Sequence, residues 1–472
     1  MTAPVLPHPL PGTLPAWMAR QRWYTGKGRV PHLEVVGALS LAPAGVPPTA
    51  GGEHPARTGD AEAASWLLRD VGGPAPVLYQ VPLTVRHEPV PGLEHALVDG
   101  DGPFVYDGCH DPAGATALLA AVVEERALDG AGVGARGHRT GSRAAVAGSR
   151  VLRGEQSNTS IIFDAATGGT PVILKVFRVV QAGHNPDVEV QEALAGGGST
   201  RVPRPLGDLL GWWPDGAARA EGHLAFAQEF LPGVQDAWRV ALRALEHGTD
   251  FADRAAALGE TTAEVHAVLA RTMPTAEADD AAREAMLAGW RRRYAAAREA
   301  VPALAAHADA VEAVLRAGAA TPWPALQRVH GDYHLGQVLD VPGRGWVLLD
   351  FEGEPLRPLA ERTAPDLPQR DVAGMLRSFD YAAGAATGTG ATGAAGGTTA
   401  TAADRARQAW ADRARAAFLD GYRAGGGRDP RSDAELLRAL ELDKALYEAV
   451  YEARNRPGWL PIPLAGVARL LG

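Results

Sequence analysis

Two short segments in the last third of the chain contain the residue types that phosphoryl transfer requires. Segment 329–339 reads VHGDYHLGQVL, and segment 346–352 reads WVLLDFE. Phosphoryl transfer to a hydroxyl needs a carboxylate beside the attacking oxygen and oxygen ligands for a Mg²⁺ ion at the nucleotide phosphates. In a kinase catalytic loop an Asp is followed closely by an Asn, and a second Asp lies downstream. Asp332, Gln337 and Asp350 stand in this order and at this spacing.

These residues predict a catalytic loop. Asp332 is the candidate catalytic base, and Gln337 and Asp350 are the candidate Mg²⁺ ligands. The side-chain amide oxygen of Gln337 is a hard ligand, as the amide oxygen of an Asn at this position would be. We expect His330 to orient the loop through its ring hydrogen bonds. A lone His-Gly-Asp turn, or a lone Asp at a strand end, is common in ordinary structure. The presence of both features, in the order found in kinases, favours a catalytic role.

A kinase site also needs a lysine for the nucleotide phosphates, and segment 171–177 (PVILKVF) contains one. Its composition predicts a strand, in which alternation places Lys175 on the face opposite Leu174 and Val176. The following helix is predicted to begin at 185–187 (NPD), where a capping Asn precedes a Pro.

Two glutamates in that helix could fix the ammonium of Lys175. Glu189, in the first turn, is the predicted partner, and Glu192, about one turn further on, is the rival.

A hairpin over residues 151–163 is predicted just before the lysine strand. Its polar tip offers backbone N–H groups and hydroxyls to the phosphates; the candidates are Ser157, Asn158, Thr159 and Ser160. The literal G-x-G-x-x-G at 132–137 follows an apparent helix at 115–128 and lies far from Lys175. We therefore expect 132–137 to be a flexible loop.

Six motifs together resemble the actinobacterial maltokinases, within the aminoglycoside-phosphotransferase and eukaryotic-like kinase superfamily. The resemblance extends from about residue 15 to the carboxyl end, and a generic aminoglycoside-type phosphotransferase would share only the loops of Asp332 and Asp350. The motifs are 22–28 (RWYTGKG), 154–160 (GEQSNTS), 174–178 (LKVFR), 330–339 (HGDYHLGQVL), 350–355 (DFEGEP) and 444–457 (KALYEAVYEARNRP).

The resemblance implies an α+β, bilobal protein-kinase-like fold with an extra N-terminal cap subdomain and a mostly helical C-terminal lobe. It also implies ATP with Mg²⁺, and phosphorylation of maltose at its anomeric hydroxyl to maltose 1-phosphate for α-glucan (glycogen) synthesis. An enzyme that converts trehalose to maltose is the implied partner.

Three regions are expected along the chain. Residues 1–98 form the cap, 99–231 the nucleotide-binding lobe, and 232–472 the helical lobe with the catalytic loops. A last strand of the nucleotide lobe, at 224–230, would place Gln228 and Phe230 at a hinge that meets the adenine. The Ala/Gly/Thr-rich stretch 382–403 is expected to be a flexible insert.

Two predicted helices offer groups that bind sugars, namely planar polar side chains and aromatic rings. They are 369–381 and 442–456, and in the second the polar and aromatic residues recur at helical intervals. A solvated helix with buried Tyr edges would show the same pattern. The candidate acceptor residues are Asp371, Arg377, Lys444, Tyr447 and Tyr451.

Composition limits the classes of partner. The chain has 472 residues, 46% of them hydrophobic, and a formal net charge of −9, which argues against nucleic acid or an anionic membrane as a main partner. Cys109 is the only cysteine, so no intramolecular disulfide can form. No run approaches the ~20 apolar residues of a membrane span. The start does not resemble a signal peptide, so a cytoplasmic protein is expected.

Two other functions remain open at this point. A phosphotransferase for another hydroxyl acceptor, such as an aminoglycoside, would use an acidic cleft, which Glu352, Glu354 and Asp371 could form. The chain could also be a non-catalytic sugar- or nucleotide-binding module, although Asp332, Asp350 and Lys175 together favour an enzyme.

Overall fold

The structure, a computed structural model, describes residues 10–41, 61–141, 145–152, 158–354, 357–386 and 401–472. The chain divides into two compact units. The first unit comprises 1–189 and 203–232, and the second comprises 190–202 and 233–472.

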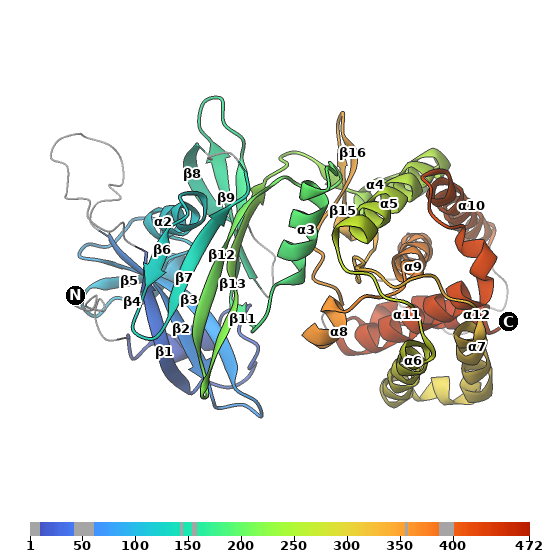
Figure 1. The fold of residues 1–472 in the computed structure, drawn as a ribbon, viewed down its shortest axis with the longest axis horizontal. Helices are drawn as coiled ribbons and strands as arrows, with labels where there is room; N and C mark the ends of the chain where they lie inside the picture. The colour runs from blue at the N-terminus through green and yellow to red at the C-terminus, as the bar shows by residue number, and fades with distance from the viewer. Residues whose placement is uncertain (1–9, 42–60, 142–144, 153–157, 355–356, 387–400) are drawn as a thin grey trace. The chain divides into compact units, whose positions relative to one another are not determined.

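The described part of the first unit is built mainly of strands in two sheets (Figure 1). Sheet A has the order β1-β2-β3-β5-β4, with β11 beside β3, and sheet B has the order β6-β7-β12-β13-β10-β9-β8. The elements are α1 (Leu14–Ala19), β1 (Leu33–Ser40), β2 (Ala61–Asp70), β3 (Val77–Arg86), β4 (Leu97–Asp99), β5 (Phe104–Asp107), α2 (Pro112–Val123), β6 (Ala127–Asp129), β7 (Gly134–Arg139), β8 (Val146–Val151), β9 (Asn158–Ala165), β10 (Val172–Phe177), β11 (Val179–Val180), β12 (Pro205–Asp215) and β13 (Ala218–Glu229), with the first turn of α3 (Pro186–Gly196).

One helix and one arginine join the two sheets. Helix α2 is capped by Asp111, which accepts from Ala113 N, and packs against strands of both sheets in a common apolar core. The buried Arg178 donates to Asp107 of β5 (2.7 Å) and to Thr159 of β9 (2.8 Å), and lies over the ring of Trp23. A charge buried this deeply is stabilised because it is paired.

Two sequence predictions about this region were wrong. The helix predicted at 115–128 ends at Val123, and Leu128 lies in β6. Residues 134–137 of the glycine-rich motif form a strand rather than a loop. A Cβ on Gly137 would lie 1.9 Å from Ala121 O, and one on Gly134 would lie 2.1 Å from the Trp212 ring. These glycines therefore allow close packing of β7, a role unrelated to phosphate binding.

The lysine strand and its neighbours form as predicted. β10 contains Lys175, with Leu174 and Val176 buried on the opposite face, and it lies between β9 and β13. Asn185 Oδ1 accepts from Asp187 N (2.8 Å) at the start of α3, which confirms the predicted cap.

The second unit is mainly helical. Helix α11 passes through its centre and contacts α6, α7, α9 and α12 (Figure 1). Beyond the rest of α3, its elements are β14 (Gln235–Asp236), α4 (Ala237–Glu246), α5 (Ala252–Thr272), α6 (Asp280–Ala300), α7 (Ala308–Ala320), β15 (Val338–Val341), β16 (Gly345–Leu348), α8 (Leu359–Thr363), α9 (Gln369–Ala385), α10 (Ala402–Ala424), α11 (Ala434–Asn455) and α12 (Pro461–Leu471).

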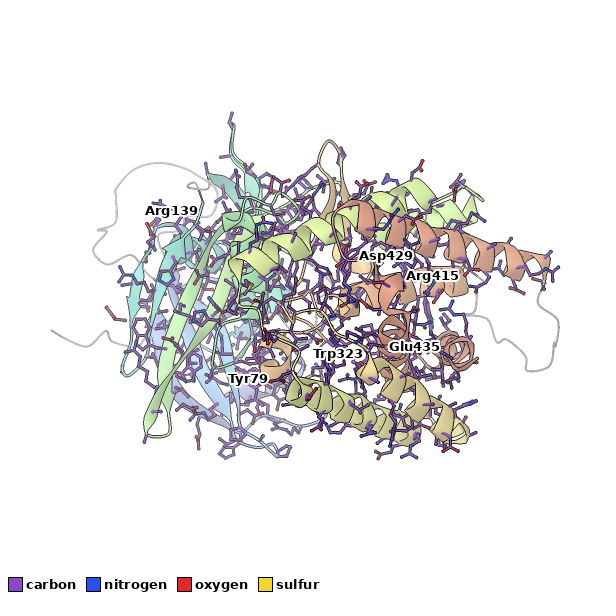
Figure 2. The ribbon with its side chains drawn as sticks, turned by 45° about the vertical axis from the view of Figure 1, so that its right-hand side comes forward. Tyr79, Arg139, Trp323, Arg415, Asp429 and Glu435 are labelled. Carbon is purple, nitrogen blue, oxygen red and sulfur yellow. The ribbon has the colours of Figure 1, made fainter. Side chains whose placement is uncertain are left out.

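Leucine, alanine and aromatic side chains from these helices form one core. Trp323, labelled in Figure 2, belongs to it and donates its indole N–H to Gly318 O (2.9 Å), as a buried Trp requires. The Ala/Gly/Thr stretch predicted as a flexible insert is helical at both ends, since α9 extends to Ala385 and α10 begins at Ala402. Residues 387–400 lie outside the described residues.

Among the described helices, none is both long and apolar enough to cross a membrane.

Candidate active site

The catalytic loop lies beside a small hairpin in the second unit. β15 and β16 pair antiparallel, and β14 pairs with β15. Asp350 follows β16 with a φ of 61°, a left-handed conformation that is rare for a non-glycine residue and that clusters at functional sites. Gln337 Nε2 donates to Asp350 Oδ2 at 3.1 Å. The two side chains predicted as metal ligands are therefore adjacent.

The side chain of His330 fixes the loop to this hairpin. Its Nε2 donates to Leu349 O at 2.8 Å, and its Nδ1 faces the N–H of Asp332 at 3.4 Å. The ring also packs on Phe351, with the ring centroids 4.6 Å apart. These contacts are those of a residue that orients the loop.

Asp371 is predicted from sequence as an acceptor residue, but the structure places its carboxylate against the backbone of the catalytic loop. It accepts from His330 N (2.8 Å) and Gly331 N (2.9 Å). Its Oδ2 also faces Nε2 of His266 at 3.0 Å. Burial alone would raise the pKa of Asp371, but His266, the ring of His330 and the backbone N–H of Gly331 lower it. Asp371 does not line the cavity beside Asp332.

Lys444 of α11 joins two carboxylates at the centre of the site. Its Nζ donates to Asp332 Oδ1 at 2.9 Å and to Glu354 Oε1 at 2.8 Å. Burial alone would raise the pKa of Asp332, but the Lys444 ammonium, with His334 and His330, lowers it to about 2. Burial disfavours the charged form of Lys444, yet Asp332 and Glu354 raise its pKa well above the usual value. Asp332 is therefore held as a carboxylate.

A cavity of about 440 Å³ opens beside Asp332. This volume lies within the range of small-molecule sites. Three predicted acceptor residues line the cavity, namely Lys444, Tyr447 and Tyr451. The other lining residues are Trp238, Asp332, His334, Gly336, Gly374, Ser378, Tyr381, Glu448, Glu452, Arg456 and Trp459.

Each carboxylate that lines this cavity has a cationic partner. Besides Asp332 with Lys444, Glu448 accepts from Arg377 (2.8 Å), and Glu452 accepts from Arg456 (2.6 Å). The wall facing the acceptor is thus polar but charge-compensated.

Arg377, predicted as an acceptor residue, lies behind that wall. It is 1% exposed and does not line the cavity. It also donates to Asp380 (3.2 Å), which accepts in turn from Arg415 (3.2 Å), a residue of α10 labelled in Figure 2. Through this network Arg377 can fix Glu448.

The pair Gln337 and Asp350 fits a Mg²⁺ ion. Rotation of the Gln337 amide by half a turn would direct its oxygen to where its nitrogen now meets Asp350, giving two hard oxygen ligands. A carboxylate oxygen of Glu352 lies within 4.8 Å of one of Asp350.

In the first unit, Lys175 meets a carboxylate other than the two considered from sequence. Its Nζ donates to Asp187 Oδ2 at 3.0 Å, and Asp187 is buried in the first turn of α3. Glu189 lies in the same turn, with its carboxylate 3.8 Å from His184 Nδ1. Glu192 belongs to the second unit.

The hairpin predicted over residues 151–163 is described at 151–152 and from Asn158 onward, and Ser157 lies outside the described residues. Ser160 stands directly opposite Lys175 on the neighbouring strand, and Thr159 opposite Val176. The hydroxyl of Thr159 already accepts from Arg178.

The predicted hinge lies at the end of β13. Gln228 is still within the strand, opposite Ile173, and the N–H of Phe230 donates to Pro171 O at 2.9 Å. The side-chain Oε1 of Gln228 is buried and has no hydrogen-bond donor among the described residues.

Sequence reasoning did not single out Asp187, Glu452 or Arg456, and it considered Glu354 only as a carboxylate of an acidic cleft. One signal was available: Glu452 and Arg456 are four residues apart on a helix, a spacing that favours an ion pair. The pairing of Glu354 with Lys444 gave no such signal, because it spans 90 residues of sequence.

The fold and the site define a class of protein, namely a phosphotransferase with a kinase-like fold of helices and strands, an N-terminal cap domain and a helical C-terminal region. The chain belongs to the family described as "Phosphotransferase enzyme family", whose model matches residues 149–436. Residues 17–111 match the model of the "Maltokinase N-terminal cap domain".

Two relatives match about 70% of the chain. A glucosamine kinase of Streptacidiphilus jiangxiensis is 33% identical over 70% of this chain and 74% of its own. One of Mycolicibacterium smegmatis is 32% identical over 69% of this chain and 80% of its own. A solved glucosamine kinase in complex with glucosamine, ADP and inorganic phosphate is 26% identical, has a TM-score of 0.66 and covers 98% of both chains.

Proposed function

We propose that this protein is an ATP-dependent maltokinase, which transfers the γ-phosphoryl group to the anomeric hydroxyl of maltose and releases maltose 1-phosphate. The maltokinase cap and sugar-kinase relatives support a sugar acceptor, and ADP in a solved relative supports ATP as donor. Use of the product in α-glucan synthesis, and a partner that converts trehalose to maltose, are part of the same proposal.

One observation favours a neutral disaccharide, namely the combination of ring surfaces and charge-compensated carboxylates in the cavity beside Asp332. Tyr447, Tyr451 and Trp459 line it and can stack on pyranose faces. Its carboxylates already have cationic partners, so they can accept hydrogen bonds from sugar hydroxyls without requiring a charged ligand.

Asp332 would position the acceptor hydroxyl. With its pKa lowered to about 2, it is ionised at neutral pH and ready to accept a hydrogen bond. Such a weak base takes the proton late, as the new O–P bond forms and the bond to the leaving phosphate oxygen breaks. This suits the loose transition state of phosphoryl transfer, in which positioning and electrostatics dominate. Lys444 would fix the carboxylate orientation.

The remaining predicted residues would hold the donor. Gln337 and Asp350 would bind Mg²⁺, which when bound neutralises charge on the phosphate oxygens. Lys175, fixed by Asp187, would bind the nucleotide phosphates, with Ser160 beside it on the adjacent strand. A contribution from Glu189 remains part of the proposal.

Glucosamine is the second candidate acceptor, because the named relatives are glucosamine kinases. Its ammonium would have to compete for a cavity carboxylate that already has a partner, such as Glu452, which accepts from Arg456. An aminoglycoside, with more positive charges, would meet the same difficulty more strongly.

The test is an acceptor survey with purified protein. We would supply Mg-ATP with maltose, glucosamine, glucose, trehalose or kanamycin, follow ADP release, and identify the product by phosphorus NMR. An anomeric phosphate formed fastest from maltose supports the proposal. Preference for glucosamine would retain a sugar kinase but reject maltose, and ADP release with none of them would reject the proposed acceptors.

A further inference from the structure

A second cavity of about 320 Å³ lies against α11, and apart from Tyr447 its lining residues have no part in the proposed reaction. It is formed by α6, the segment leading into α8, and α11. Tyr447 lines this cavity and also the acceptor cavity. Four of its lining residues are arginines, Arg292, Arg293, Arg357 and Arg454, and we call it the arginine pocket.

The positive charge in this pocket is only partly compensated. Among its lining residues, Glu361 is the only carboxylate. It lies 3.9 Å from Arg292 and 3.8 Å from Arg357, too far for hydrogen bonds of normal length. Arg454 is exposed and forms no ion pair with the described residues.

Arg293 and Arg357 differ in how closely carboxylates pair with them. Arg293 makes two short hydrogen bonds to Asp443, at 2.5 and 2.6 Å. Arg357 is 12% exposed, yet it meets Asp366 only at 3.4 Å and Glu354 at 3.8 Å. Its Nε is buried without a hydrogen-bond partner in the described structure. Carboxylates therefore compensate the charge of Arg357 less well than that of Arg293, although the unpartnered Nε of Arg357 is itself buried.

The pKa shifts of the two arginines agree with this difference in pairing. Burial disfavours the cation of both side chains, but Asp443 raises the pKa of Arg293. For Arg357, burial and the nearby Arg370 lower the pKa. An anion in the pocket would compensate the positive charge around Arg357.

We propose that the arginine pocket binds the phosphate group of a sugar phosphate. Guanidinium groups bind phosphate through paired N–H donors, and Arg292, Arg357 and Arg454 supply several of them. Tyr447, Val450 and Ala296 give the same pocket an apolar wall on which a pyranose ring can pack. The site is separate from Asp332, and the proposal holds whichever sugar is phosphorylated there.

Binding is measured by titration calorimetry with the full chain, without ATP or acceptor. The probes are glucose 1-phosphate, inorganic phosphate and glucose. We expect glucose 1-phosphate to bind more tightly than inorganic phosphate. The double variant Arg292→Gln/Arg454→Gln should weaken it about tenfold or more, since each change removes a charged donor from an exposed position.

Three control variants locate the ligand. Arg271→Gln removes an exposed helical arginine that donates to Ala267 O of its own helix, and should leave the affinity unchanged. Lys175→Ala and Tyr451→Ala alter only the proposed phosphate and acceptor sites, and should also retain it. If Lys175→Ala or Tyr451→Ala lost glucose 1-phosphate binding while the Arg292→Gln/Arg454→Gln variant kept it, the ligand would be assigned to the active site and the proposal would be overturned. Absence of glucose 1-phosphate binding at millimolar concentration would overturn it too.

Discussion

Two cavities adjoin helix α11, and they differ in how their charges are compensated. In the acceptor cavity beside Asp332, the carboxylates Asp332, Glu448 and Glu452 each accept from a cation at hydrogen-bond distance. In the arginine pocket, four guanidinium groups line the wall with one carboxylate, and the Nε of Arg357 lacks a partner in the described residues.

The comparison shows that the number of charged residues in a cavity wall does not by itself predict the charge of the ligand. By residue type the acceptor cavity looks acidic and would suit a cationic sugar. The pairing of these carboxylates supports the proposed neutral sugar, because removing a carboxylate from a buried ion pair leaves the partner cation uncompensated. In the arginine pocket the excess remains after pairing, and it favours an anion.

The largest expected effect tests whether the acceptor cavity is the reaction centre. Asp332→Asn should lower kcat by about 10²- to 10⁴-fold, since it removes the only oxygen charge proposed to accept the proton. Steady-state kinetics with maltose measures this. Asp340→Asn, on β15 and paired with the half-exposed Arg254, is the matched control and should retain turnover. Near-normal kcat in Asp332→Asn would remove the catalytic assignment.

The second prediction concerns a variant that removes the cation shared by Asp332 and Glu354. Lys444→Met leaves Asp332 and Glu354 without their shared cation, and should cost about 3–5 kcal/mol of unfolding free energy, as for other broken buried pairs. Urea unfolding at pH 7 measures it. A loss below about 1 kcal/mol would mean that the pair is solvated and weak.

The same pair predicts a pH dependence. Because the pKa of Asp332 is lowered to about 2, its contribution to stability is present above its unfolded pKa of about 4 and is lost as the pH falls towards 2. The raised pKa of Lys444 gives a contribution that is lost only when the pH rises above its unfolded value of about 10.4. In Lys444→Met the acid limb of the kcat profile should move to higher pH, because burial raises the pKa of Asp332 and only His334 and His330 then lower it.

A third variant would make the acceptor cavity resemble an acidic one. Arg456→Gln removes the cation that pairs with Glu452, which is 2% exposed. The ratio of kcat/KM for glucosamine over maltose should rise about tenfold, the effect of one compensated charge. Arg454→Gln, two residues away and outside this cavity, is the control. An unchanged ratio would show that pairing does not set acceptor charge.

The last comparison separates a structural arginine from a proposed ligand-binding arginine in the arginine pocket, and its Arg454 variant has the smallest expected effect. Arg293→Gln should cost about 3 kcal/mol, since Asp443 is buried and would keep only Arg370 at 3.2 Å. Arg454→Gln should change stability by less than about 0.5 kcal/mol, as for other surface substitutions. Thermal unfolding of both variants measures the difference. Equal losses would indicate that Arg454 is also part of the folded framework.

Local sequence patterns predicted the elements that present the chemistry. The alternation around Lys175 gave a strand, the Asn-Pro-Asp sequence gave the start of α3, and the run before Asp350 gave β16. These signals depend on neighbouring residues alone, so one sequence suffices. The same reasoning failed at Gly134 and Gly137, because the need for glycine there comes from Trp212 and α2, which are distant in sequence.

By itself, the sequence determined the order of the predicted catalytic motifs and the helix face of Lys444, Tyr447 and Tyr451, which lines the cavity beside Asp332. Only the tertiary structure decided which charges compensate one another. It paired Lys444 with Glu354 and Asp332, directed Asp371 to the loop backbone, and left Arg357 with an unused donor. The physical reason is that electrostatic energy depends on distance and burial, and segments far apart in the chain set both only when they pack.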